Sequence, residues 1–245
     1  MRRLHRVELK LQDRLALFRK TKSIANASVA DTRAAWKRFR ATKASEPINE
    51  ALASMAGSRV RCAYCSDSFA SDVDHFRPIA TFPQKAFDWE NMIRVCTTCN
   101  RKKGERFPLG GDGEPRLIDP TTEDPWSHLT LDPQTGFIAP RYTLAGFDEF
   151  GEATLAILET INFEAATEAR RKQARRLLGA MKFVLDDDDS RESRRELSIE
   201  VANDELGISR WYAHWEGSAE EFPIQLQAKY LLTWKAFVRK AAKTT

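Results

Sequence analysis

Apolar side chains recur at helical spacing toward both ends of the chain. Near the amino end, leucine, tryptophan and phenylalanine return every three or four positions and predict helices over residues 8–20, 31–43 and 45–57. After Gly151 the helical pattern returns over residues 153–161, 164–185 and 224–242. An acidic run at residues 186–189 is expected to form a break between helices. Both ends of the chain are therefore predicted to be helical.

Between the helical ends, the periodic segments are short. Residues 72–76 favour a strand, and a helical turn is expected after Cys96. Residues 129–139, LTLDPQTGFIA, predict a hairpin whose turn contains Asp132, Pro133 and Gly136. The fold is thus predicted to be α+β. We expect a basic helical arm, a small central module, a loop and hairpin extension and a helical region, at residues 1–60, 61–107, 108–150 and 151–245.

Composition limits the classes of protein to which this chain can belong. A chain of 245 residues with 42% hydrophobic residues can bury a substantial core. No window approaches the roughly 18 uninterrupted apolar residues of a membrane span, and the opening MRRLHRVELKLQD lacks the apolar stretch of a secretory signal. We therefore expect a cytoplasmic protein. In that reducing compartment, cysteines are expected to bind metal rather than form disulfides.

Charge is distributed unevenly along the sequence. Residues 1–61 hold 15 Lys and Arg against 5 Asp and Glu, which leaves 24 against 30 for the remainder. A basic arm of this kind attracts phosphate backbones, although basic helices are also often simply solvated faces. If the arm follows a nucleic acid, the expected contacts are Arg33, Lys37, Arg38 and Arg40. An alternative is that the arm docks a partner protein.

The four cysteines form two C-x2-C pairs, Cys62 with Cys65 and Cys96 with Cys99. Four thiolates in two knuckles are the ligand set of tetrahedral structural zinc, and the alternative is four unligated thiols in the core. A closed four-sulfur site leaves zinc no open position. Any catalysis must therefore use other residues and another metal.

Polar residues lie between and just after the knuckles. Asp74 and His75 are adjacent, Asn91 follows in DWENMIRVC, and Asn100 comes directly after the last cysteine. Taken singly, the histidine could be structural and each asparagine could cap a turn or a helix. Taken together, the four residues are expected to converge on one small scaffold, with His75 facing the surface.

The segments CAYC, DVDHFRP, WEN and CTTCNRKKG resemble, in order and spacing, the zinc-containing HNH nucleases. The resemblance covers residues 62–104 and implies a zinc-stapled ββα-metal module between the helical regions. It implies that His75 is the general base, that Asp74 and Asn100 bind the catalytic metal, and that Asn91 orients the His75 ring. Asn100 stands where many members of the family have a histidine.

These residue types suit phosphodiester hydrolysis. The reaction needs a base that activates water and a cation that neutralises charge on the phosphorus and the departing oxygen. Histidine can accept a proton near neutral pH, and a carboxylate with an amide oxygen suits Mg²⁺ or Mn²⁺ better than zinc. Arg77, Lys102 and Lys103 could contact flanking phosphates, or could be ordinary surface cations.

A longer resemblance extends beyond this module. MRRLHR before it and PRLIDPTTEDPWSHL after it resemble the HNH subunits of Septu and retron anti-phage defence systems. This resemblance implies an ATPase partner of the ABC or SMC type. The sequence has no G-x4-GK-[ST] loop, so any ATP dependence is expected to come from a partner. Two functions stay open: a metal-dependent DNA nuclease, and a zinc-stapled adaptor that binds nucleic acid or an ATPase without cutting.

Overall fold

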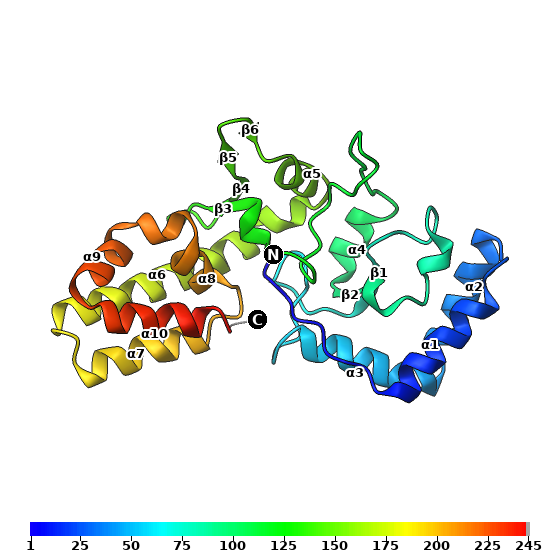
Figure 1. Cartoon of the computed structure of the whole chain (residues 1–245), viewed down its shortest axis with the longest axis horizontal. Helices are drawn as coiled ribbons and strands as arrows, with labels where there is room; N and C mark the ends of the chain where they lie inside the picture. Colours follow the sequence, from blue (N-terminus) through cyan, green and yellow to red (C-terminus); the bar gives the residue numbers. More distant parts are fainter. Residues whose placement is uncertain (244–245) are drawn as a thin grey trace.

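The computed structural model describes residues 1–243 and has the expected α+β architecture. The molecule is elongated, with the amino-terminal helices and a small hairpin at one end and the carboxy-terminal helices at the other (Figure 1). The amino terminus and the last residues that the structure describes approach the middle of the molecule (Figure 1). No helix within residues 1–243 has the length and apolar character needed to cross a membrane.

Three helices form the amino-terminal arm, as predicted: α1 (Leu11–Ser23), α2 (Val29–Arg40) and α3 (Glu46–Met55). Helix α2 begins at Ser28, whose hydroxyl accepts a hydrogen bond from the backbone N–H of Asp31 at 3.1 Å. Its apolar side buries Trp36 and Phe39, while its basic residues face solvent. The arm therefore has one face for packing and one charged face.

The central module contains two strands and one helix, β1 (Asp72–His75), β2 (Met92–Val95) and α4 (Thr97–Lys103). The strands are antiparallel, with Asp74 opposite Ile93. Because side chains alternate along a strand, Asp72 and Asp74 lie on one face of β1, and Val73 and His75 on the other. Helix α4 contacts the first face, and the second face belongs to a core shared with the arm.

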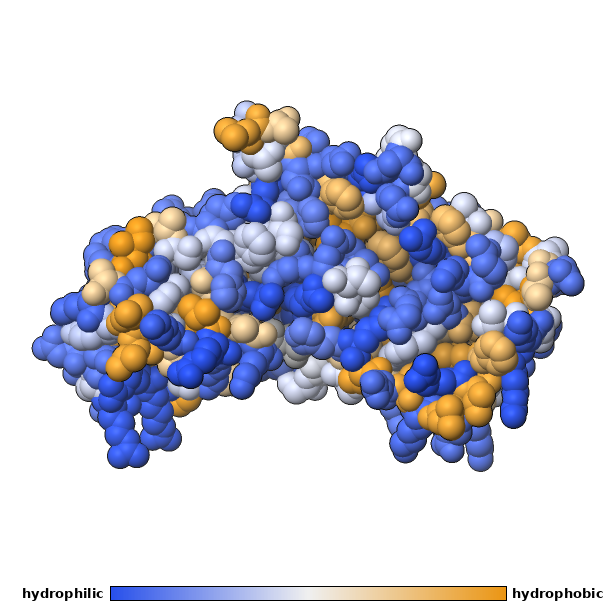
Figure 2. All heavy atoms as spheres, viewed as in Figure 1, coloured by the Kyte–Doolittle hydropathy of each residue, from blue (hydrophilic) through white to orange (hydrophobic). Residues whose placement is uncertain are grey.

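The extension carries two short hairpins, made by β3 (Leu129–Leu131) with β4 (Ile138–Pro140) and by β5 (Tyr142–Thr143) with β6 (Gly146–Phe147). The first is the predicted hairpin, and Gly136 in its turn has φ +77°. A Cβ at Gly136 would lie 1.9 Å from the Thr167 carbonyl oxygen, so the turn packs directly on the following helical region. The second hairpin projects from the surface with its apolar residues exposed (Figure 2).

Six helices complete the described chain: α5 (Glu149–Ile157), α6 (Glu164–Asp186), α7 (Arg191–Ala202), α8 (Ile208–His214), α9 (Glu221–Lys229) and α10 (Leu231–Ala241). The predicted break after α6 is present, and Asp188 and Asp189 there have positive φ. The expected helical stretch 224–242 is interrupted at Tyr230, whose hydroxyl donates to Asp188 at 3.0 Å. Helices α7 and α8 lie inside the predicted helical region 151–245, in a stretch for which no individual helix was predicted.

The structure has two hydrophobic cores, and their boundaries differ from those of the four segments predicted from the sequence. The larger core joins the cysteines of the central module to the extension and the carboxy-terminal helices, through buried side chains such as Trp126 and Trp211. The smaller core joins the arm to the outer face of the β1–β2 hairpin, where Trp36, Phe39 and Phe87 pack together. The central module is therefore enclosed by the two helical regions.

His128 fastens the extension to the start of α5. Its Nδ1 lies 3.0 Å from Asp148 Oδ1, and its Nε2 lies 3.1 Å from Glu123 Oε2. Burial alone would lower the pKa of His128, but the hydrogen bonds to the two carboxylates outweigh burial and leave the pKa raised. Asp148 also caps α5, because its Oδ1 accepts from the backbone N–H groups of Phe150 and Gly151. A protonated His128 thus links two acids at a helix start.

We expect the stabilising interaction of His128 with Asp148 and Glu123 to weaken as pH rises. Because the folded pKa of His128 lies above the unfolded value, its stabilising contribution is complete below about pH 6.5 and is lost as pH rises through the folded pKa. His128→Gln should be less stable than the unsubstituted protein near pH 6, with a difference that shrinks toward about pH 9. Thermal unfolding of both proteins across this range measures the effect, and a pH-independent difference would contradict it.

Candidate active site and metal centre

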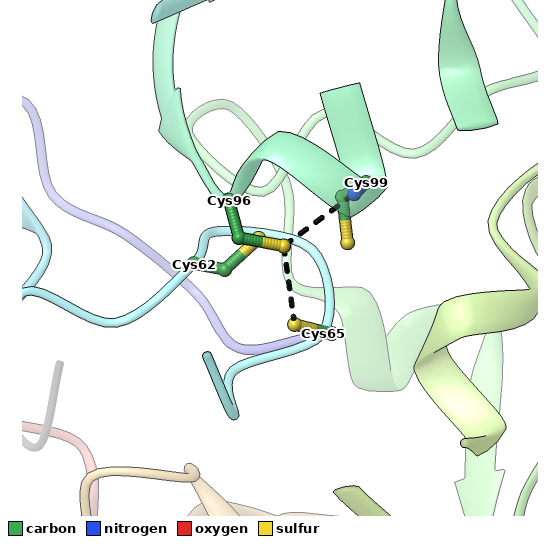
Figure 3. A group of neighbouring side chains, drawn as sticks. All are labelled: Cys62, Cys65, Cys96 and Cys99. Carbon is green, nitrogen blue, oxygen red and sulfur yellow. Dashed lines mark hydrogen bonds between the residues drawn. The ribbon is translucent and has the colours of Figure 1, made fainter. Parts of the chain in front are cut away.

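The four cysteines converge on one point. Their sulfur atoms all lie within 4.8 Å of one another, and all four residues are buried (Figure 3). Cys65 Sγ and Cys96 Sγ are 4.0 Å apart. Sulfurs bound tetrahedrally at about 2.3 Å from zinc would lie about 3.8 Å from each other, so the four thiols fit a zinc ion. The geometry supports a structural zinc centre at the predicted residues.

Local backbone structure shapes both knuckles. In the first, Ser66 has φ +59° and its N–H donates to the Cys62 carbonyl at 2.9 Å, which closes a tight turn. In the second, Cys96 is the N-cap of α4, and its sulfur accepts from the Cys99 N–H at 3.4 Å. Cys99 Sγ also lies 3.1 Å from Thr160 Oγ1. The centre therefore ties α4 to the segment that follows α5.

His75 is held by a backbone carbonyl. Its Nε2 lies 2.8 Å from the Ala86 oxygen. Because a carbonyl oxygen can only accept, Nε2 carries the proton and Nδ1 has the free lone pair. Burial lowers the pKa of His75 to about 4, although the Ala86 carbonyl opposes this shift. The ring is therefore neutral at pH 7, with Nδ1 able to accept a proton.

The expectation that His75 faces the surface was wrong. The residue is 8% exposed, and its ring meets the edge of Trp36 at a centroid distance of 4.6 Å. Trp36 belongs to α2, so the amino-terminal arm covers this face of the hairpin. The sequence contains no local signal for this contact, because the two residues are far apart along the chain.

Asn91 ties together the loop between β1 and β2. Its Oδ1 accepts from the Arg77 N–H at 2.7 Å, and its Nδ2 donates to the carbonyls of Arg77 and Lys85, each at 3.0 Å. Ala86, whose carbonyl holds His75, is the next residue after Lys85. Asn91 therefore contacts the loop rather than the histidine, and it can orient His75 only through this loop.

Asp74 is buried within a network of hydrogen bonds. Its Oδ2 accepts from the Tyr64 hydroxyl at 2.7 Å, and its Oδ1 accepts from Lys103 Nζ at 3.1 Å. Lys103 also donates to the His75 carbonyl at 2.8 Å. Burial raises the pKa of Asp74, and the nearby Lys103 and Tyr64 act in the opposite direction. Tyr64 and Lys103 are thus site residues that the sequence analysis did not place beside Asp74.

The expectation that Lys103 contacts phosphate was wrong. Its side chain is 0% exposed, because α4 turns it toward β1. Lys103 lies three residues after Asn100, so helical spacing places both on the same face of α4. This spacing was the signal that could have identified Lys103 as an inward-facing residue.

Asn100 lies beside Asp72 rather than Asp74. Its Nδ2 donates to Asp72 Oδ2 at 3.1 Å, and Thr97 Oγ1 donates to Asp72 Oδ1 at 3.2 Å. Burial acts to raise the pKa of Asp72, but these hydrogen bonds prevail and lower it. Strand alternation in DVDH could have identified Asp72, since it shares the face of Asp74. Two carboxylates and an amide therefore line the face of β1 and α4 where oxygen ligands for Mg²⁺ or Mn²⁺ were expected.

The remaining basic candidates differ in their surroundings. Arg77 lies over the rings of Phe82 and Phe107, at 5.4 and 5.6 Å from their centroids. Lys102 pairs with Glu159 at 2.7 Å. The four arm residues are exposed on α2, with one of them paired to Glu105: Arg33, Lys37, Arg38 and Arg40. The charged face of the arm is therefore open to solvent.

We expect about one zinc ion per chain, bound by the four cysteines. Removing it with a strong chelator should unfold the central module, because two short strands and a short helix bury little core on their own. Cys99→Ser should lose zinc, whereas Thr98→Ala, at an exposed position of the same helix, should retain it. Elemental analysis and circular dichroism measure both results. A zinc-free protein with unchanged structure would contradict the assignment.

A second expectation concerns Asn91. Asn91→Ala removes three hydrogen bonds to buried or half-buried backbone groups and should cost about 1–3 kcal/mol of folding free energy. Gln84→Ala, at an exposed position of the same loop, is the matched control and should cost much less. Urea unfolding measures both variants. Equal stability of the two would show that Asn91 does not hold the loop.

Comparison with known proteins agrees with this geometry. Residues 62–106 match the family model of the HNH endonucleases. The chain is also 31% identical over 112 residues to the Septu protein PtuB of Bacillus thuringiensis, a match that covers 44% of this chain and 39% of the relative. The chain thus matches less than half of that relative's length. The cysteine centre, the hairpin and α4 all fall within the family match, and residues 62–106 therefore form an HNH domain.

Proposed function

We propose that this chain is a metal-dependent endonuclease that hydrolyses phosphodiester bonds of DNA, as the effector of an anti-phage defence system. The observation that carries the proposal is the arrangement of His75 within an HNH domain. Its Nε2–H is bound to the Ala86 carbonyl, and Asn91 anchors the loop that supplies this carbonyl. A neutral histidine with a fixed ring and a free Nδ1 is the group that activation of water requires.

In this mechanism, His75 Nδ1 takes a proton from the attacking water. Asp74 and Asn100 would hold Mg²⁺ or Mn²⁺, and the ion would supply positive charge to neutralise the phosphate. Asp72 stands beside Asn100 and orients its amide. Burial raises the pKa of Asp74, and Lys103 opposes this rise because its Nζ lies 3.1 Å from the carboxylate. Asn91 is a positioning residue, since it acts on His75 through the loop.

The exposed basic face of α2 supports a nucleic-acid substrate. Its four cations, Arg33, Lys37, Arg38 and Arg40, lie on the helix that also packs Trp36 against His75. Backbone phosphates bound there would lie next to the hairpin that carries the proposed base. Arg77 and Lys102 are proposed to contact phosphates near the cleavage point, and Lys102 would exchange Glu159 for its phosphate.

The proposed partner is an ATPase of the ABC or SMC type. The similarity to a Septu protein supports a role in defence, and the sequence has no phosphate-binding loop of its own. We place the protein in the cytoplasm, where four free thiols can stay reduced for zinc. The ATPase would then supply the nucleotide dependence of the system.

One observation favours the second candidate function, a non-catalytic adaptor. Both oxygens of Asp74 already accept hydrogen bonds, from Tyr64 and Lys103, and the residue is 5% exposed. A carboxylate engaged in this way has fewer lone pairs for a metal ion. The adaptor would keep the zinc centre and the basic arm but would not cut.

The test compares His75→Gln with the unsubstituted protein. Glutamine retains an amide donor for the Ala86 carbonyl but cannot act as the base, so cleavage should fall about a hundredfold or more. Zinc content should be unchanged, and the folding free energy should fall by only about 0.5–1.5 kcal/mol from loss of the ring contact with Trp36. Purified protein is incubated with plasmid, single-stranded DNA and RNA in the presence of Mg²⁺ or Mn²⁺. If the chain is silent alone, the same comparison is made in the reconstituted complex.

Two results would decide against the nuclease. Cleavage by His75→Gln at the unsubstituted rate, with contaminating nuclease excluded, would remove His75 as the base. Loss of zinc or of folding in His75→Gln would make the histidine structural and favour the adaptor. As a separate check on the metal, Asn100→Ala should raise the Mg²⁺ or Mn²⁺ concentration needed for half-maximal cleavage.

A further inference from the structure

A cleft of about 310 Å³, the junction cleft, lies between the segment just before the HNH domain and the carboxy-terminal helices. The segment after α3, the middle of α6 and the segment after α7 line it. Its charged lining residues are four cations and one acid, namely Arg59, Arg61, Lys172, Arg176 and Glu205. Residues far apart in the sequence thus bring positive charge to one concave surface.

Two glutamates beside this cleft form ion pairs with its arginines. Glu205 Oε2 lies 3.0 Å from Arg61 Nε and 3.4 Å from Arg59 Nε. Glu200 Oε2 lies 2.9 Å from Arg176 Nε. A guanidinium group has five N–H donors, so each arginine keeps donors for a further acceptor. The side chains of Arg59 and Arg176 are 71% and 55% exposed, which leaves these donors open to solvent.

The backbone that carries Arg59 and Arg61 is held in an unusual conformation. Val60 between them has φ +48°, a region that β-branched residues rarely adopt. The turn persists because the Val60 carbonyl accepts from the Ala70 N–H at 2.8 Å, and the Arg61 N–H donates to the Ala56 carbonyl at 3.0 Å. Cys62 follows directly, so the zinc centre also fixes the position of Arg61.

The composition of the cleft indicates its ligand. The cleft beside Asn91 has an excess of acidic residues, five against two cations, namely Asp88, Glu90, Glu114, Asp119, Glu123, Arg77 and Lys85. The junction cleft has the opposite balance. Within residues 1–243, no aromatic ring lines it that could stack on a base. Phosphate groups alone therefore match its chemistry, as in contacts that position a duplex without reading its sequence.

The charge and geometry of the junction cleft lead us to infer that it binds the backbone phosphates of DNA, as a second contact separate from the arm. The inference rests on the proposed function, because it presumes a DNA substrate. A nucleic acid held at both places would be fixed on the amino-terminal arm and on the carboxy-terminal helices at once. The carboxy-terminal helices would then take part in substrate binding.

The test measures DNA binding in the His75→Gln protein, which should not cut. The double substitution Arg59→Gln with Lys172→Gln removes two exposed cations from the cleft. Arg61 and Arg176 keep their ion pairs with Glu205 and Glu200. Arg191→Gln with Arg195→Gln, at exposed positions of α7 outside the cleft, is the matched control. The probe is a labelled duplex of about 30 base pairs, roughly three helical turns, titrated by fluorescence anisotropy at several salt concentrations.

The cleft variant should bind roughly tenfold more weakly, and its plot of log affinity against log salt should be shallower by about two. The control should keep the original slope. An unchanged slope in the cleft variant would overturn the inference and leave the proposed nuclease standing, whereas absence of DNA binding by the parent protein would overturn both. Tight binding of ATP that the same substitutions abolish would make the cleft a nucleotide site and also overturn the inference.

Discussion

The convergence of four thiols within 4.8 Å of one another is the constraint on which the central module depends. Two four-residue strands and a seven-residue helix bury too little apolar surface to fold alone. The knuckles compensate, because Cys96 follows β2 directly and Cys99 lies in the first turn of α4. They set the angle between hairpin and helix, and with it the distance between β1 and Asn100.

Strand β1 divides the site into two layers. Its first face turns Asp72 and Asp74 toward α4, where amide and ammonium groups meet them. Its second face turns His75 toward Trp36 and the aromatic core of the arm. Oxygen ligands and the proposed base therefore come from adjacent residues but lie in different environments, one polar and one aromatic. The burial that keeps the histidine neutral comes from the arm.

The sequence predicted those features that depend on local pattern. Cysteine spacing identified the cluster of four thiols, and helical periodicity identified most helices of the arm and of the carboxy-terminal region. Turn residues identified the hairpin at residues 129–139. Features that depend on which faces meet were missed. Lys103 was placed at the surface although its helical spacing from Asn100 puts both residues on one face of α4, and the burial of His75 depends on a distant tryptophan. Helix α7 was missed because its arginines and glutamates obscure a narrow apolar stripe.

The buried pair of Asp74 and Lys103 affects how genetic results on this protein are understood. Replacing Asp74 leaves an ammonium group with 0% exposure opposite an uncharged side chain, and breaking such a pair costs about 3–5 kcal/mol. A loss of this size can lower the amount of protein in a cell severalfold. An inactive phenotype at Asp74 therefore reports abundance as well as chemistry. Joint replacement of Asp74 and Lys103 by uncharged residues separates the effect on abundance from the effect on chemistry. It removes the carboxylate without leaving a buried ammonium group unpaired.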